Sequence, residues 1–289
     1  MQIINADSMQ VYRGMDIGTA KPGRDVLKCL PHRLLDIVDP NQQFNAGEFT
    51  RHADRLIPEI SRKGGIPLIA GGAAYYLRCF MYGLPAAPAG STRVRRELKE
   101  LLKSRGLSYL REELHRVDPA TAAALDARDS YRIVRALEVY RTAGKPLSAY
   151  PVPREMRKGY SFLCIGLERQ REDLYRRIEE RVDRMFTLGL ADEVRNLISR
   201  GYTADDPGMK GIGYREFFEM RKGYLNSGGL KALIKTNSRR YAKRQMTFFR
   251  SIPGVRWYTP EQAGEIENCI GKFWKSRQEG RGSGAGQPT

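Results

Sequence analysis

Three short apolar runs, separated by longer stretches with helical spacing, most constrain the fold of this chain. They lie at residues 2–5, 66–70 and 160–167, and each is short enough to be a buried strand rather than a helix. Between the first two runs, residues 48–63 repeat apolar side chains at helical intervals and stop at a Gly-Gly pair. Strands that alternate with helices indicate an α/β fold, in which the chemistry lies at the carboxyl ends of the strands.

A break rich in proline, alanine and glycine at residues 83–91 marks the main internal boundary. The pattern from residue 92 to about residue 144 is helical, and no strand signal interrupts it. We therefore predict four segments. They are a first part of the α/β core at 1–85, an all-α insertion at 86–158, a second part of the core with basic C-terminal helices at 159–270, and a disordered Gly/Ser/Arg-rich tail at 271–289.

The charge balance favours a polyanionic partner. Lysine and arginine total 50 against 33 aspartate and glutamate residues, a formal net charge of +17. Such an excess is typical of proteins that bind nucleic acid, and a basic proteome or a need for solubility is the alternative. Residues 230–249 gather cations and aromatic side chains on one predicted helix, a combination suited to phosphates and stacked bases.

The sequence gives little support to a membrane, secreted or metal-binding protein. No apolar run approaches the roughly 18 residues of a membrane span, and no basic-then-apolar leader opens the chain, so we expect a cytoplasmic protein without membrane contact. The cysteines form no CxxC pair and the histidines have no metal-ligand spacing, so we expect reduced thiols and no metal site. These residues are Cys29, Cys79, Cys164, Cys269, His32, His52 and His115.

Two strand ends carry residues suited to chemistry. Asp7 follows the first strand, and a loop with glycines, hydroxyls and cations suited to a polyanion follows it. Gly71-Gly72 follows the second strand and precedes a helix predicted from Ala73, a place where backbone amides can hold a phosphate. A solvated loop and an ordinary tight turn remain the alternatives. The loop residues are Tyr12, Arg13, Gly14, Gly18, Thr19 and Lys21.

Several long motifs, in fixed order, resemble the bacterial tRNA dimethylallyltransferases. They are ADSMQVYRGMDIGTAKP, PHRLLDIVDP, IPLIAGGAAYYLR, SYRIVRALEVY, KGIGYREF and YAKRQMTFFR, spread over residues 1–258. The resemblance implies a P-loop NTPase-like parallel sheet with an all-α insertion that clamps the tRNA anticodon arm. It implies transfer of a dimethylallyl group from dimethylallyl diphosphate to the exocyclic N6 of the adenosine beside the anticodon, giving N6-isopentenyladenosine. Mg²⁺ would neutralise the diphosphate, and we expect a monomer.

The resemblance also assigns roles to residues. The aspartate matching Asp7 is the general base that takes the proton of the adenine amine. Gly71, Gly72, Ala73 and Arg215 match positions near the diphosphate and its transition state. Positions expected to contact tRNA match Asp7, Ser8, Met9, Gln10, Arg95, Tyr131, Arg132, Ile133, Val134, Arg135, Lys210, Gly211, Ile212, Gly213, Tyr214, Arg215, Lys243, Arg244, Gln245, Met246, Thr247, Phe248, Phe249 and Arg250.

The chain departs from the family pattern in two ways. It has no GxxxxGK[ST] P-loop and begins at what would be the second strand of the family's fold. Because the first strand would lie between those at 66–70 and 160–167, its loss should leave two open sheet edges. We therefore expect the natural protein to carry this segment before residue 1. Second, Ala73 stands where the family usually has threonine, whose hydroxyl contacts the diphosphate.

Two other functions remain open. Without a donor cradle the chain would be a catalytically impaired tRNA-binding homologue, which would keep tRNA affinity without holding the diphosphate. A related enzyme that alkylates a free adenine nucleotide is the other alternative, and the basic helical insertion argues against it because a small acceptor needs no clamp.

Overall fold

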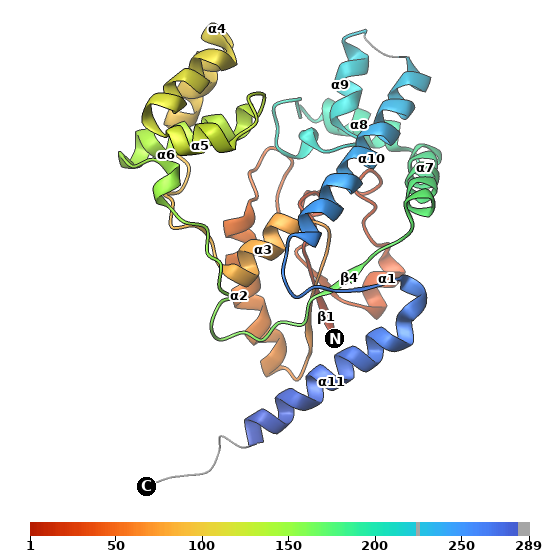
Figure 1. Ribbon diagram of the computed structural model, residues 1–289. Coiled ribbons are helices and arrows are strands. Elements are labelled where there is room, and N and C mark those ends of the chain that lie inside the picture. The colour runs from red at the N-terminus through yellow and green to blue at the C-terminus, as the bar shows by residue number, and fades with distance from the viewer. Residues whose placement is uncertain (224–225, 283–289) are drawn as a thin grey trace. The chain divides into compact units, whose positions relative to one another are not determined.

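The computed structural model describes residues 1–223 and 226–282, which form two compact units (Figure 1). One unit comprises Met1–Met81 with Lys158–Thr289, and the other is Tyr82–Arg157. The second unit spans nearly the same residues as the insertion expected at 86–158. The first unit contains both sheets and Asp7 with the residues that pack around it.

A parallel sheet organises the first unit, and the expected mixed α/β fold is confirmed. β1 (Gln2–Asn5) lies between β2 (His32–Arg33) and β3 (Pro67–Ala70), and all three strands run parallel. Ile3 of β1 is in register with His32 on one side and Leu68 on the other. The carboxyl ends of β1 and β3 therefore end at the same edge of the sheet, which brings Asp7 near Gly71.

The third predicted strand does not pair with this sheet, which agrees with the expectation that a chain without the family's first strand leaves two open sheet edges. β4 covers only Ile165–Leu167 and pairs in parallel with β5 (Arg256–Tyr258) in a separate two-stranded sheet. Among the residues described, no strand lies between β3 and β4 to connect the two sheets. The sequence analysis missed β5, although Val255 to Tyr258 is a short β-branched and aromatic run.

α2 (Ala46–Arg62) packs against β1 and β3 of the parallel sheet. α2 begins where Asn45 and Glu48 form a reciprocal capping box, two residues before the predicted start, and it buries Phe49 and Ile60. The largest fully buried side chains of this core also include Ile4, Met15 and Tyr214. The helices are α1 (Arg24–Cys29), α2 (Ala46–Arg62), α3 (Ala74–Tyr82), α7 (Arg171–Thr187), α8 (Leu190–Ser199), α9 (Arg215–Arg221), α10 (Ser227–Arg250) and α11 (Ala263–Gly282), with 3-10 turns at Gly208–Lys210 and Pro260–Gln262.

The second unit is helical throughout, as its sequence predicts. α4 (Thr92–Val117) bends at Gly106, whose φ of 80° is unsuited to most other residues, and α5 (Pro119–Ala124) and α6 (Ser130–Ala143) follow before a 3-10 turn at Leu147–Ala149. Fully buried leucines and isoleucine from α4 and α6 form its core: Leu98, Leu110, Leu114, Ile133 and Leu137.

The expected disorder from residue 271 does not hold for residues 271–282. α11 continues to Gly282, and residues 283–289 of the predicted tail lie outside the described residues. No helix in the described ranges is both long and apolar enough to cross a membrane.

Candidate active site

Asp7 is held in a defined position directly after β1. Its Oδ1 atom accepts hydrogen bonds from the backbone N–H groups of Met9 (2.7 Å) and Gln10 (3.2 Å). No group within residues 1–223 or 226–282 donates to Oδ2, and the residue is only partly buried. The side chain is thus fixed through one oxygen and keeps the other for a ligand.

The Gly71-Gly72 turn packs directly against the chain entering Asp7. A Cβ atom at Gly71 would lie 2.3 Å from the carbonyl carbon of Ala6, so only glycine fits there. The N–H of Ala73 donates to the carbonyl of Ala6 at 2.9 Å, and the N–H of Ala74 donates to the carbonyl of Gly72 at 3.0 Å. These two amides already have partners, so for them the tight-turn alternative is correct and the predicted phosphate seat is not.

Two side chains from distant helices share the electrostatic environment of Asp7. Arg181 of α7 is exposed on one side, but the protein around it removes enough water for desolvation to lower the pKa of its guanidinium. The charge of Asp7 opposes that change in pKa. Desolvation raises the pKa of Tyr241 on α10, and the charge of Asp7 raises it further. Because such charge effects require proximity, α7 and α10 both approach the end of β1.

The cations of the loop after Asp7 are paired with carboxylates of the protein, whereas we expected them to bind a polyanion. The Lys21 ammonium, with its side chain 6% exposed, donates to the Tyr12 carbonyl at 2.6 Å and to carboxylates of Asp16 (2.7 Å) and Asp36. Arg13 pairs with Asp39 at 3.2 Å. Lys21 therefore stabilises the loop from inside, because a buried ammonium needs such partners.

The KGIGYREF stretch packs on the same loop. A Cβ at Gly211 would lie 2.4 Å from the methyl carbon of Met9, and one at Gly18 would lie 2.5 Å from the ring of Tyr214. Tyr214 is fully buried, so its side chain packs the loop and the prediction that it contacts tRNA is wrong for that side chain. Lys210 is exposed, Gly211 and Gly213 are buried, and Ile212 between them is partly buried against the core.

A buried carboxylate orients Arg215. Glu216 is fully buried and accepts hydrogen bonds from the Arg215 Nε (3.0 Å), the Asn237 amide (2.7 Å) and the Gly213 N–H (2.8 Å). The Arg215 side chain stays 43% exposed. Among the described residues the Arg215 guanidinium is engaged only at Nε, so its two terminal nitrogens remain for an anion.

The comparison with known families decides the identity of this arrangement. A family profile described as IPP transferase matches residues 10–252, more than half of the chain. The chain belongs to the IPP transferase family.

Individual relatives of this IPP transferase agree in both sequence and structure. It is 48% identical to the tRNA dimethylallyltransferase of Geobacter metallireducens over 270 residues, covering 93% of this chain and 87% of that one. The crystal structure of a tRNA isopentenylpyrophosphate transferase from Bacillus halodurans has a TM-score of 0.69 at 34% identity, covering 96% of this chain and 89% of that one. A eukaryotic dimethylallyltransferase acting on tRNA has a TM-score of 0.74 at 25% identity, with 96% and 73% covered.

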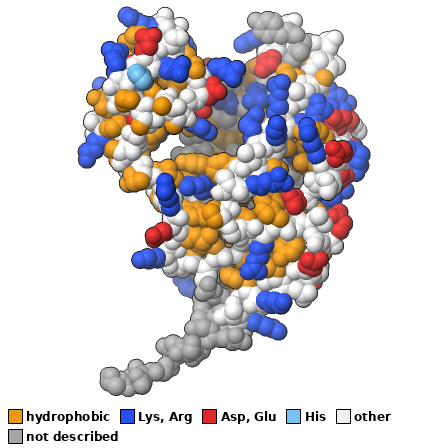
Figure 2. Space-filling model, in the orientation of Figure 1, with side chains coloured by type: hydrophobic (Ala, Val, Ile, Leu, Met, Phe, Trp, Pro, Cys, Tyr) orange, Lys and Arg blue, Asp and Glu red, His pale blue; other side chains and the backbone are white. Residues whose placement is uncertain are grey.

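The cations of α10 separate into two groups. Lys231 and Lys235 pair with Asp183 of α7, each at 2.9 Å, and Arg239 pairs with Glu179. No acidic side chain in the described part of the chain pairs with Arg240, Lys243 or Arg244, which are exposed. Figure 2 shows lysine and arginine side chains gathered along the part of this face that α10 occupies in Figure 1.

The remaining α10 residues divide between surface and interior. Thr247 and Arg250 are exposed, and Arg250 pairs with Glu168 at 3.1 Å. Gln245 contacts the Gly72 turn, and the other three predicted positions are partly buried: Met246, Phe248 and Phe249. Ser8 beside Asp7 is also partly buried.

In the helical unit, only some of the predicted tRNA contacts have accessible side chains. Tyr131 is 75% exposed, and Arg132 is exposed beside Asp129 at 3.3 Å. Ile133 and Val134 are buried in the unit's core, so predicting their side chains as tRNA contacts is wrong; helical periodicity turns them inward. Arg95 and Arg135, also expected to contact tRNA, both bind a buried carboxylate, Glu138, at 2.9 and 2.8 Å.

Sequence reasoning missed Arg181, Glu216 and Glu193 of α8, whose carboxylate accepts hydrogen bonds from backbone N–H groups of the loop after Asp7. Arg181 follows Ile178 by three positions and precedes Met185 by four, so the apolar stripe of α7 includes an arginine at its border. An arginine at the border of a buried stripe could have been recognised in the sequence as a candidate site residue. Glu193 and Glu216 gave none, because their partners come from segments far away in sequence or from the backbone.

Proposed function

We propose that the protein transfers a dimethylallyl group from dimethylallyl diphosphate to the exocyclic N6 of the adenosine adjacent to the anticodon in tRNA. The product would be N6-isopentenyladenosine. The observation that carries this proposal is the geometry of Asp7, fixed through Oδ1 with Oδ2 left over, in a chain of the IPP transferase family. Relatives with 48% and 44% identity are named tRNA dimethylallyltransferases.

The residues around Asp7 support a simple substitution at an allylic carbon. The adenine N6 forms a bond to that carbon, the carbon–oxygen bond to diphosphate breaks, and the N6 proton passes to Oδ2 of Asp7. General-base assistance of this kind contributes about 10²–10⁴ in rate. The Arg181 guanidinium near Asp7 and the free terminal nitrogens of Arg215 are cations suited to the charge that develops on diphosphate.

The site offers no preformed cage for Mg²⁺. Within the described ranges, no three His, Cys, Asp or Glu side chains gather in a way that could hold a metal ion. We propose that Mg²⁺ enters as part of the donor substrate, bound mainly to diphosphate oxygens, which is its usual mode with phosphate substrates. Ala73 supplies no hydroxyl to that diphosphate, so the donor depends on other groups.

Two features of the acceptor follow from the same proposal. Exposed Arg240, Lys243 and Arg244 would contact the phosphates of the anticodon stem-loop, and exposed Tyr131 offers a surface for a base. The target adenosine would leave its stack to reach Asp7. We also propose that the protein acts in the cytoplasm as a monomer, which light scattering of the purified chain would test.

A direct assay tests the function. The full chain is incubated with unmodified tRNA, dimethylallyl diphosphate and Mg²⁺, and the digested nucleosides are analysed by mass spectrometry. We expect N6-isopentenyladenosine at one position beside the anticodon. Parallel reactions replace tRNA with AMP, and a filter assay measures tRNA and donor binding separately. Modification of AMP alone, or tRNA binding without donor binding or transfer, would contradict the proposal.

A further inference from the structure

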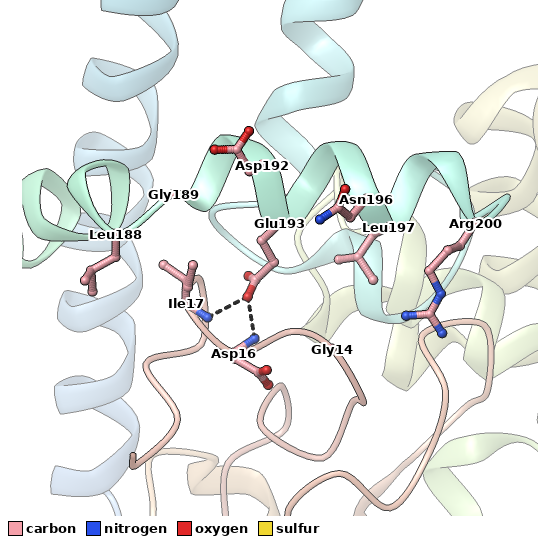
Figure 3. Close-up of a pocket in the computed structure, with 10 residues that line it drawn as sticks. All are labelled: Gly14, Asp16, Ile17, Leu188, Gly189, Asp192, Glu193, Asn196, Leu197 and Arg200. Carbon is pink, nitrogen blue, oxygen red and sulfur yellow. Dashed lines mark hydrogen bonds between the residues drawn. The ribbon is translucent and has the colours of Figure 1, made fainter. Parts of the chain in front are cut away.

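Glu193 of α8 fixes a loop that has no regular secondary structure. One carboxylate oxygen, Oε2, accepts from the backbone N–H groups of Asp16 (2.8 Å) and Ile17 (2.7 Å). The other, Oε1, accepts from the N–H of Gly18 (3.1 Å) and from the hydroxyl of Tyr214 (2.7 Å). Figure 3 shows Glu193 pointing from α8 to this loop.

The hydrogen bonds to Glu193 take the place of the helix or strand hydrogen bonds that the loop does not make. Three consecutive amides converge on one anion, and amides without partners would be costly in a partly buried place. Hydrogen bonds to a carboxylate are shorter and about twice as strong as neutral ones. α8 is itself rigidly seated, because Leu190, Val194 and Leu197 are all buried in the core. Glu193 therefore fixes the loop relative to α8, a helix that the core holds in place.

The loop passes this constraint to Asp7 through Gln10. The side-chain amide of Gln10 donates to the carbonyl oxygens of Thr19 (3.1 Å) and Ala20 (3.2 Å), which directly follow the amides held by Glu193. The backbone N–H of Gln10 donates to Oδ1 of Asp7. Glu193 is thus linked to the carboxylate that we assign as the base by two sets of hydrogen bonds, joined through the backbone of residues 18–20.

The same carboxylate also fixes the second motif. Its bond to Tyr214 ties the loop to the segment that carries Arg215, and the Tyr214 ring lies against Gly18. The hydroxyl of Tyr214 stays protonated at neutral pH, since burial and the charge of Glu193 both raise its pKa. The two motifs that flank the reaction centre therefore share one anionic anchor.

We propose that Glu193 is a positioning residue for the transfer reaction, which holds Asp7 and the Arg215 segment in register through the amides of residues 16–18 and the Tyr214 hydroxyl. The inference rests on the proposed function. It predicts that a change at Glu193 lowers the rate of the chemical step without removing any group that touches substrate. Misplacement of a catalytic group by about 1 Å can cost about 100-fold in rate.

The test compares Glu193→Gln with Asp192→Asn. Glutamine keeps the shape of Glu193, but it loses the charge and turns an amide nitrogen toward a backbone donor. Asp192 is the adjacent residue on α8, points away from the loop and pairs only with Arg195 among described residues, so it is a matched control. The readout is the single-turnover rate constant with saturating enzyme over tRNA, which does not depend on the fraction of folded protein.

We expect a fall of about 10- to 100-fold for Glu193→Gln and the wild-type rate for Asp192→Asn. Deuterium exchange should quicken at the amides of residues 16–18 in the first variant only. Combined with Gln10→Ala, the effects should be less than additive, because both act on one path. If Glu193→Gln does not fold, Tyr214→Phe removes one donor to the carboxylate and should give a smaller fall in the same assay.

A wild-type single-turnover rate in folded Glu193→Gln, or in Tyr214→Phe where that variant replaces it, overturns the inference alone. An equal fall in Asp192→Asn does so too, because it would assign the effect to α8 in general. A wild-type chain that transfers nothing overturns the proposed function, and the inference with it.

Discussion

The side-chain amide of Gln245 donates a hydrogen bond of 2.8 Å to the carbonyl oxygen of Gly72. The contact joins α10 to the turn after β3, across 173 positions of sequence. It places the cationic half of α10 next to the carboxyl edge of the parallel sheet, where Asp7 lies. This hydrogen bond therefore holds the basic surface of α10 close to the candidate base, Asp7.

Gln245→Ala should loosen this connection. The change leaves the Gly72 carbonyl with the N–H of Ala74 as its remaining donor and breaks the contact with α10. We expect a loss of about 1 kcal/mol in the free energy of unfolding together with a lower transfer rate. Thr247→Ala is the control, because among the described residues the Thr247 hydroxyl bonds only to the Lys243 carbonyl within its own helix. Urea denaturation and single-turnover transfer measure both effects. Equal behaviour of the two variants would show that the contact is unimportant.

Gly71→Ala should destabilise the chain. The new Cβ would meet the backbone of Ala6 at 2.3 Å, and backbone cannot move aside as a flexible side chain does. Overpacking of this kind costs about 1–3 kcal/mol, measurable as a lower midpoint in urea. Gly23→Ala is the control, since a Cβ at Gly23 meets nothing within 4 Å. A Gly71→Ala midpoint equal to that of the control would contradict the close approach.

Asp7→Asn separates chemistry from folding. Asparagine keeps an oxygen that can accept from the N–H groups of Met9 and Gln10, so we expect an unchanged melting temperature. The variant cannot take a proton at the second position, and the transfer rate should fall about 10²- to 10⁴-fold. Calorimetry and single-turnover transfer give the two quantities. Retention of the wild-type rate would remove Asp7 from the role of base.

The sequence was most informative where a pattern is local. The strand at residues 2–5 and the helical middle of the chain follow from periodicity, and the structure has both. Its second unit begins at Tyr82, just before the predicted break at residues 83–91. Sheet membership was not local. β4 depends on β5, whose residues lie more than eighty positions later, and no pattern within 160–167 predicts that pairing.

The site shows the same limit at the level of side chains. Lys21 and Arg240 look alike as basic residues in the sequence, yet Lys21 is enclosed by carboxylates and Arg240 is exposed without an acidic partner among described residues. Their difference depends on which acidic groups the fold brings near. Ile133 and Val134 were misassigned for a simpler reason, because the motif match ignored the helical face that buries them.

Exposed cations of α10 should control tRNA affinity. Arg244→Gln removes one charge that has no acidic partner in the described chain, and we expect weaker tRNA binding and a salt dependence reduced by about one ion. Lys231→Gln is the matched control on the same helix, because Asp183 already neutralises Lys231. Filter binding across a salt series gives both slopes. The assignment is wrong if Lys231→Gln changes the slope as much as Arg244→Gln.

The helical unit should contain an acid-sensitive cap at Asp118. One oxygen of this buried carboxylate accepts from the N–H of Thr121 and the other from the N–H of Ser148, each at 3.0 Å. Burial alone would raise the pKa of Asp118, but these hydrogen bonds outweigh burial and hold the pKa below its ordinary value. A carboxyl whose pKa is lower in the folded state than in the unfolded state stabilises the fold only while it is ionised.

The contribution of Asp118 should therefore be complete above about pH 5 and disappear as the pH falls below about 4, toward the lowered folded-state pKa. Asp118→Asn turns an amide toward the Ser148 N–H and should cost about 1–3 kcal/mol in the free energy of unfolding at neutral pH. Denaturation followed by circular dichroism at each pH should show this difference shrinking in acid. Glu112→Gln, an exposed change on α4, should give no such pH-dependent difference. A difference for Asp118→Asn that stays constant down to pH values well below 4 would mean that the charge of the carboxylate does not stabilise the cap.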